Sequence, residues 1–113
     1  MTTLYGISNC DTIKKAKRWL DDNNIPYVFH DYKKSGIDKK SLQAWCSEFG
    51  FESLLNKRGT TWRKLDDSLK ENVNEAAAIE IMLENTSVIK RPVLISGKTR
   101  ILGFDENAYQ SLL

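Results

Sequence analysis

The first 31 residues of the chain have the pattern of a strand, a helix and a second strand, and this order constrains the fold more than any other feature. Residues 2–7 alternate between polar and apolar side chains, which is typical of a short strand. From Asp11 to about Asn23, the apolar residues gather on one helical face, and residues 27–31 are rich in strand formers. Such a unit pairs its strands in parallel, so the loop before the helix lies at the carboxyl edge of the sheet, where ligands bind in open α/β sheets.

The middle of the chain is predicted to be helical. Asp38 is a suitable N-cap for a helix that ends at Gly50. The apolar residues with helical spacing in this segment are Leu42, Trp45, Cys46 and Phe49. Residues 51–55 predict a short helical turn, residues 56–61 a loop, and residues 66–83 one or two further helices.

The last part of the chain predicts a β-hairpin followed by a helix. Residues 88–96 are rich in strand formers, although Pro92 interrupts them, and residues 100–104 form a returning strand after a turn at Gly97. Asp105 is a suitable cap for a last helix. Because no internal repeat, low-complexity tract or linker is found, we expect residues 1–113 to form a single domain.

Composition limits the classes of protein that this chain can belong to. Its 113 residues suffice for one hydrophobic core, and no apolar run approaches the length of a membrane span. A net charge of +2 is far weaker than the charge of a typical nucleic-acid binder. Two cysteines are too few for a disulfide framework, and the amino terminus has no pattern of a secretory signal. We therefore expect a cytoplasmic monomer that contacts neither membranes nor nucleic acid.

Cys10 is the residue whose position favours chemistry. It lies at or just before the amino end of the first helix, where unpaired N–H groups and the helix dipole stabilise a thiolate, the nucleophilic form of cysteine. Backbone donors from Asn9 to Thr12 would hold an anion there, although the neighbouring Asp11 opposes ionisation of the thiol. The alternative is that Cys10 is a buried, unreactive residue. Cys46 shares an apolar helical stripe, so core packing is favoured over a role as a resolving thiol.

The sequence offers further candidates, of which Lys14 and Arg58 are weak and the Arg91-Pro92 pair is more specific. Lys14 places a cation in a first helical turn, which is unexpected unless an anion or a thiolate lies nearby. Arg58, in the predicted loop, is as consistent with a solvated side chain as with a ligand contact. Before a strand, the Arg91-Pro92 pair leaves backbone groups free to meet a ligand, and sequence alone predicts a trans bond. His30 is more consistent with packing than with catalysis, and the single histidine and two distant cysteines lack the spacing of metal ligands.

Three segments together resemble the arsenate reductase (ArsC)/Spx family and, within it, the YffB-like branch. They are YGISNCDTIKKA at residues 5–16, LLNKRGTTWRKL at residues 54–65 and IKRPVL at residues 89–94. The resemblance covers essentially the whole chain. It implies an α/β, thioredoxin-like fold in which a four-stranded mixed sheet carries a helical subdomain inserted at about residues 38–86. It also implies a cis bond at Pro92 facing Cys10, with Cys10 as the nucleophile and Arg91 as the residue that binds an oxyanion or a thiol partner.

The chain also departs from the patterns of two members of this family. Arsenate reductases that it resembles carry two further arginines, and the matching positions here are Asn56 and Gly103. Since a tetrahedral oxyanion is best held by several charge-assisted donors, these differences disfavour arsenate as the substrate. Spx-type regulators carry a Cys-x-x-Cys pair, whereas this chain has Ile13 at the second cysteine position.

The leading hypothesis is therefore a glutathione-dependent thiol oxidoreductase. Cys10 would attack a disulfide or an oxidised small substrate, and glutathione would resolve the mixed disulfide because no second thiol is nearby. We expect glutathione and this substrate as partners, with no bound cofactor and no metal. The alternatives are an arsenate reductase that uses the same nucleophile and a Spx-like regulator that binds RNA polymerase.

Overall fold

The computed structural model describes residues 1–8 and 10–113, and it divides the chain into two compact units. The first unit combines Met1–Ser35 with Arg91–Leu113, and the second is Gly36–Lys90. The second unit contains the segment for which the sequence predicts a helical insertion. No helix in the described part of the chain is long and apolar enough to cross a membrane.

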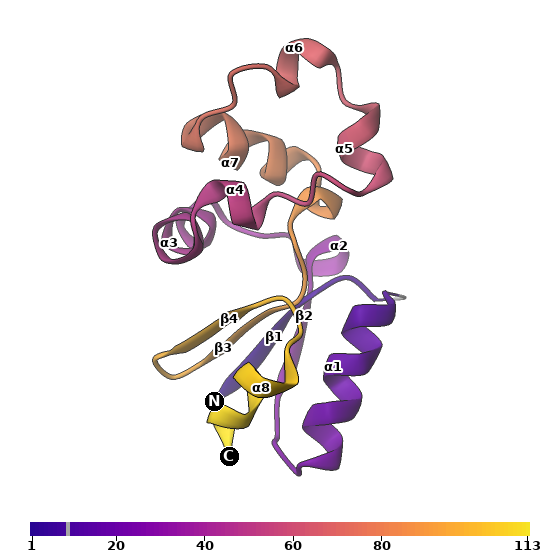
Figure 1. Ribbon diagram of the computed structural model, residues 1–113, viewed down its shortest axis with the longest axis vertical. Helices are drawn as coiled ribbons and strands as arrows, with labels where there is room; N and C mark the ends of the chain where they lie inside the picture. Colours follow the sequence, from indigo (N-terminus) through magenta and orange to yellow (C-terminus); the bar gives the residue numbers. More distant parts are fainter. Residues whose placement is uncertain (9) are drawn as a thin grey trace. The chain divides into compact units, whose positions relative to one another are not determined.

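The first unit is built on a mixed four-stranded sheet (Figure 1). Its strands are β1 (Thr2–Gly6), β2 (Val28–Asp31), β3 (Val93–Ser96) and β4 (Thr99–Leu102). The strand order is β2-β1-β3-β4, in which β1 runs parallel to β2 and antiparallel to β3, and β3 and β4 are also antiparallel. The predicted strand–helix–strand unit, the mixed sheet and the hairpin are therefore confirmed.

One face of this sheet carries the core of the first unit. Helix α1 (Asp11–Asp22) and helix α8 (Glu106–Tyr109), which continues into the 3-10 turn η2 (Gln110–Leu112), pack beside the strands (Figure 1). The fully buried residues of the cluster are Leu4, Ala16, Leu20, Leu94 and Tyr109. The Tyr109 ring meets Trp19 and Phe104 edge to face, at centroid distances of 5.5 and 5.0 Å. This packing holds α1 against β1 and thereby fixes where the loop between them runs.

The register of the sheet brings three segments to one edge. Gly6 and Asp31 are paired at the ends of the parallel strands, and Val93, which begins β3, pairs with Tyr5 near the end of β1. The loop before α1, the end of β2 and the residues before β3 therefore meet at this edge. The Arg91-Pro92 bond just before β3 is cis, as the family resemblance implies and contrary to the trans bond that sequence alone predicts.

The second unit is helical. Its elements are α3 (Lys39–Phe49), α4 (Phe51–Leu54), α5 (Thr60–Lys64), α6 (Asp67–Lys70), α7 (Glu75–Glu84) and the 3-10 turn η1 (Thr86–Val88). Asp38 caps α3 as predicted, because its Oδ1 accepts a hydrogen bond from the N–H of Ser41 at 3.2 Å. Asn74 caps α7 in the same way, with the N–H of Ala77 at 2.8 Å. Gly50 ends α3 with a φ of 85°, a conformation that favours glycine.

The structure differs from the sequence predictions at three places. Helix α2 (Tyr32–Ser35) follows β2 directly, where no helix was predicted, and α5 begins inside the predicted loop of residues 56–61. The predicted strand of residues 88–96 is regular only from β3 onward. Pro92 has no N–H to donate to a strand ladder, which accounts for the late start of β3. Ile89 pairs instead with Leu55 in an isolated bridge of the helical unit.

Gly6 offers a test of how closely α1 packs on β1. A Cβ atom at this position would collide with the side chain of Ile13, which is buried in α1. We expect Gly6→Ala to lower the free energy of unfolding by about 1–3 kcal/mol, the usual cost of overpacking, as measured by urea unfolding. Adding Ile13→Val removes the colliding methyl group, so the double variant should recover part of the loss. A Gly6→Ala protein as stable as the original would contradict this packing.

Candidate functional site

Cys10 is partly exposed and lies at the N-cap of α1. Its backbone is extended, with φ −106° and ψ 130°, and its carbonyl oxygen accepts the first helical hydrogen bond from the N–H of Lys14 at 3.0 Å. The side chain is therefore placed where the first N–H groups of the helix have no helical acceptor. This position agrees with the sequence prediction and disagrees with the alternative of a sealed, unreactive residue.

The surroundings of Cys10 favour its thiolate form. Partial burial raises the pKa of the Cys10 thiol, but the N–H of Ile13, the side chain of Arg91 and the N–H of Thr12 lower it by more, so the net pKa falls below the ordinary value. The two backbone donors belong to the first turn of α1, and Arg91 adds both a hydrogen bond and a positive charge. Because the thiolate is the nucleophilic form of cysteine, these contacts favour the reactivity of Cys10.

Arg91 reaches the thiol because the residues before β3 lie at the same edge as the loop before α1. Its charge also acts on the buried phenol of Tyr32, in α2. Burial and the neighbouring Tyr5 raise the pKa of Tyr32, whereas Arg91 lowers it, and the balance keeps this phenol uncharged at neutral pH. Arg91 therefore lies within electrostatic range of both the thiol and a neutral hydroxyl group.

Asp31 is a buried carboxylate at the end of β2, with 7% of its surface exposed. Burial raises its pKa, but hydrogen bonds from the N–H of Lys33, the hydroxyl of Ser8 and the N–H of Lys34 lower it by more. The N–H of Lys33 lies 2.8 Å from Oδ1. Asp31 thus ties the first turn of α2 to Ser8, two residues before Cys10, and helps to hold the loop that carries the thiol.

Three aromatic rings lie on β1, β2 and α2 near this edge. Tyr5 and His30 are partners in the register of the parallel strands, and their ring centroids are 5.0 Å apart. The ring of Tyr32 lies 6.5 Å from Tyr5 and 6.2 Å from His30. His30 therefore packs among aromatic rings, as the sequence favours.

Cys46 differs from Cys10 in every respect that matters for reactivity. It lies on α3 in the second unit, and 3% of its surface is exposed. Burial raises the pKa of its thiol, and the carboxylate of Glu75 raises it further. Core packing, the interpretation favoured from sequence, agrees with this environment.

The remaining predicted site residues fall into different places. Thr12 contributes its main chain to the thiol site, whereas Asn9 lies outside the described residues. Lys14 is exposed in the first turn of α1, and its role as a ligand stays a prediction. Arg58 belongs to the second unit, where it lines a separate pocket, so its part in the thiol site also stays a prediction.

Asp31 and Tyr32 were not identified from sequence. The sequence contained one indication of Asp31, since it is a polar residue at the end of a strand in a parallel pair, and such residues lie at the ligand-binding edge of the sheet. The short helix α2, which supplies two of the donors to Asp31, has no strong sequence signature over its four residues.

A mixed four-stranded sheet, a thiol at the start of its first helix and a cis proline before an antiparallel strand define a thioredoxin-like thiol protein. The chain belongs to the ArsC family, whose sequence pattern it matches over residues 5–112. The fold class and the family expected from the sequence are therefore confirmed. Family and site together support a thiol-based redox function.

Three comparisons show how closely the chain follows its relatives. It is 43% identical to an uncharacterised protein of Haemophilus influenzae, over 98% of this chain and 97% of the relative. It is 28% identical to the global transcriptional regulator Spx of Streptococcus pneumoniae, over 100% of this chain and 86% of the relative. The solved structure of a YFFB protein is 50% identical and has a TM-score of 0.96, over 98% of this chain and 97% of that one.

Replacing Asp31 with alanine removes the acceptor that joins Ser8 to α2. We expect Asp31→Ala to lower the free energy of unfolding by about 1–3 kcal/mol at pH 7, since three hydrogen bonds to a buried carboxylate are lost. Because the pKa of Asp31 is lower in the folded chain than in the unfolded one, its ionised form stabilises the fold above the unfolded pKa of about 3.9. This contribution is lost as the pH falls through the folded pKa, so the two proteins should converge in acid.

Urea unfolding at a series of pH values measures this effect. Asp38→Ala is the comparison variant in the other unit: it removes an exposed helix cap, so it should destabilise the fold less at pH 7 than Asp31→Ala does. A difference between Asp31→Ala and the original protein that grows toward acid would contradict the assignment.

Proposed function

We propose that this protein is a glutathione-dependent thiol oxidoreductase in which the Cys10 thiolate attacks a disulfide or an oxidised small substrate. The observation that carries the proposal is a partly exposed thiol at the N-cap of α1 that is reached by the N–H groups of Thr12 and Ile13 and by the Arg91 side chain. A thiolate is both the attacking species and the better leaving group in thiol–disulfide exchange. The site therefore favours formation of a mixed disulfide and its later cleavage.

The reaction balances in three exchange steps. The Cys10 sulfur forms a bond to one sulfur of the substrate disulfide, the S–S bond of the substrate breaks, and its other sulfur leaves as a thiolate. One glutathione thiolate then attacks the Cys10 sulfur of this mixed disulfide, so that the substrate's first sulfur leaves as a thiolate and Cys10 carries glutathione. A second glutathione thiolate attacks the glutathione sulfur of that adduct, which forms oxidised glutathione and releases the Cys10 thiolate. The substrate disulfide gains two electrons, two glutathione molecules lose them, and Cys10 returns to its thiolate form.

Glutathione is proposed as the resolving thiol because Cys46 is unsuited to that task. Its sulfur is buried, its pKa is raised, and it belongs to the other unit of the chain. The position that would complete a Cys-x-x-Cys pair is Ile13, a core residue of α1. An external thiol must then complete the cycle.

Arg91 is proposed to orient the substrate as well as to stabilise the thiolate. A guanidinium group pairs strongly with a carboxylate, and glutathione carries two carboxylates. The N–H groups of Thr12 and Ile13 would hold the sulfur, while the Arg91 side chain would hold a neighbouring anionic group of the substrate.

Arsenate reduction is less well supported by the same site. Gly103 stands where the resemblance places a family arginine, and it adopts a φ of 79° while its N–H donates to the carbonyl oxygen of Pro92 at 2.8 Å. It has no side chain with which to bind an oxyanion. Among the described residues, the arginine that acts on the Cys10 thiol is Arg91, through a hydrogen bond and its charge.

The Spx relatives supply a second candidate, a regulatory protein in which Cys10 acts as a sensor. The similarity to Spx extends over the whole of this chain. Retrieval of RNA polymerase by the tagged protein, together with a full biological effect of Cys10→Ser, would favour this candidate over the enzyme.

Mass spectrometry after treatment with oxidised glutathione tests the enzyme directly. We expect one glutathione adduct, located on Cys10, which reduced glutathione removes. Cys46→Ala should form the same adduct, whereas Cys10→Ser should form none while folded. Absence of an adduct on Cys10, or equal labelling of both cysteines, would argue against the proposal.

Arg91 variants separate the two roles of the guanidinium group. Arg91→Gln should slow adduct formation from oxidised glutathione by about tenfold, since one charge-assisted interaction is lost. Hydroxyethyl disulfide has no carboxylates, so its reaction reports thiolate stabilisation alone and should be affected less. Equal slowing with both reagents would contradict a role in binding carboxylates, and Arg100→Gln, on exposed β4, is the matched charge control.

A further inference from the structure

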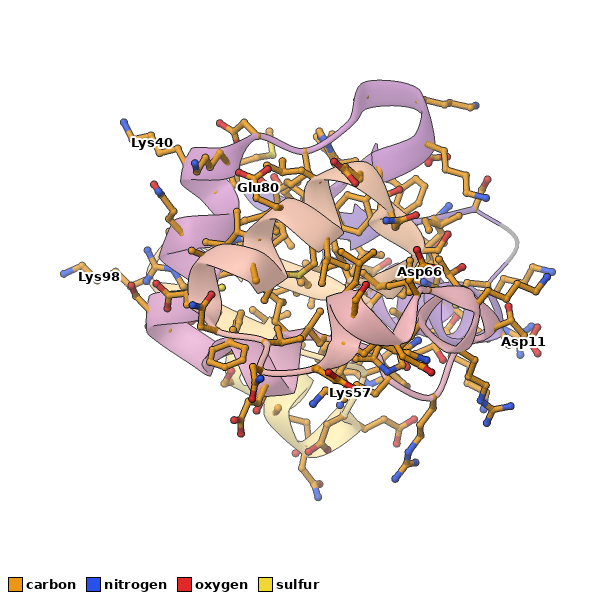
Figure 2. All side chains as sticks on the ribbon, turned by 90° about the horizontal axis from the view of Figure 1, so that it is seen from above. Asp11, Lys40, Lys57, Asp66, Glu80 and Lys98 are labelled. Atoms are coloured by element: carbon orange, nitrogen blue, oxygen red, sulfur yellow. The ribbon has the colours of Figure 1, made fainter. Side chains whose placement is uncertain are left out.

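The second unit contains a basic pocket that is separate from the residues of the thiol site. It has a volume of about 420 Å³, within the range of small-molecule sites. Its lining includes three cationic side chains, Lys57, Arg58 and Lys90, together with Asn56 and Glu52. We name it the basic pocket. Figure 2 shows that Lys57, which lines the pocket, and Glu80 of the same unit lie on different sides.

The three cations of the basic pocket are not neutralised within the described part of the chain. The ion pairs of this unit join Lys39 to Glu80 at 3.5 Å and Lys70 to Asp67 at 3.6 Å, and neither pair includes a lining cation. Glu52 is the acidic residue of the lining, and it forms no ion pair with them among the described residues. Three positive charges and one negative charge leave an excess of two positive charges around the cavity.

Backbone hydrogen bonds hold the walls of the basic pocket together. The N–H of Asn56 donates to the carbonyl oxygen of Val88 at 2.6 Å, and the N–H of Lys90 donates to that of Leu54 at 2.7 Å. These bonds lie on either side of the bridge between residues 55 and 89, so the two segments that carry the cations are tied to each other. Like charges are therefore kept close by the fold, and binding need not first order the loop.

Two side-chain contacts restrain the loop further. The ammonium group of Lys57 lies 5.7 Å from the centre of the buried Trp62 ring, a cation–π distance. The side-chain oxygen of Asn56 accepts a hydrogen bond from the N–H of Arg58 at 3.2 Å. Both contacts leave the guanidinium group of Arg58 available to a ligand in the cavity.

We propose that the basic pocket binds a small dianion, such as a phosphomonoester or a dicarboxylate, and that it does so independently of Cys10. Two negative charges match the excess charge of the lining, and Arg58 supplies a planar donor group suited to phosphate or carboxylate oxygens. Lys57 and Lys90 provide point charges on the two tied segments. The inference goes beyond the proposed thiol chemistry and does not depend on it.

The test is an NMR titration of the full-length Cys10→Ser protein with inorganic phosphate or succinate at constant ionic strength. We expect saturable shifts of the backbone amides of residues 56–58 and 90, equal to those of the original protein. Tighter binding of phosphate would assign the phosphomonoester class, and tighter binding of succinate the dicarboxylate class. Shifts that do not saturate, or that spread equally over the basic face of α1, would overturn the proposal.

Charge variants of the titrated protein give the decisive comparison. Arg58→Gln and Lys90→Gln should each weaken binding by about tenfold, the loss expected for one charge-assisted contact. Arg63→Gln removes the same charge from an exposed position on α5 outside the lining, and it should change the affinity by less than about twofold. Equal weakening by all three variants would show a general charge effect and contradict a defined site.

Discussion

The pairing of β1 with β2 in parallel and with β3 in antiparallel orientation is the constraint on which the thiol site depends. This arrangement brings the carboxyl ends of two strands and the start of a third to one edge. Cys10 lies between β1 and α1, Asp31 is the last residue of β2, and Arg91 lies just before β3. Because the three residues come from distant parts of the sequence, the site exists only when the sheet has formed.

The thiolate form of Cys10 is stabilised by its neighbours in the fold, which distinguishes it from an ordinary surface cysteine. Partial burial alone would disfavour the thiolate, but the N–H groups of Thr12 and Ile13 and the Arg91 side chain outweigh it. Cys46 shows the opposite balance, because burial and a nearby carboxylate both raise its pKa. One chain thus contains one thiol whose surroundings favour the thiolate and one whose surroundings favour the neutral form.

Much of this arrangement could be predicted from residues 1–31, because helical and strand periodicities are strong there and their order implies parallel pairing. The position of Cys10 followed from the same pattern. The cis bond at Pro92 was predicted from the family resemblance, since local sequence favours a trans bond. The role of Arg91 in binding an oxyanion or a thiol partner was inferred from the same resemblance. The end of a parallel strand could have pointed to Asp31, but its hydrogen bonds could not be predicted, because they depend on a four-residue helix and on a loop that only the folded sheet brings together.

The most direct measurement of the central claim is the pH dependence of iodoacetamide alkylation at Cys10 in the folded protein, with the modified residue identified by mass spectrometry. If the first turn of α1 and Arg91 stabilise the thiolate, the rate should rise with an apparent pKa below about 8.5, the value of an unperturbed cysteine. An apparent pKa of about 8.5 or higher would contradict the account.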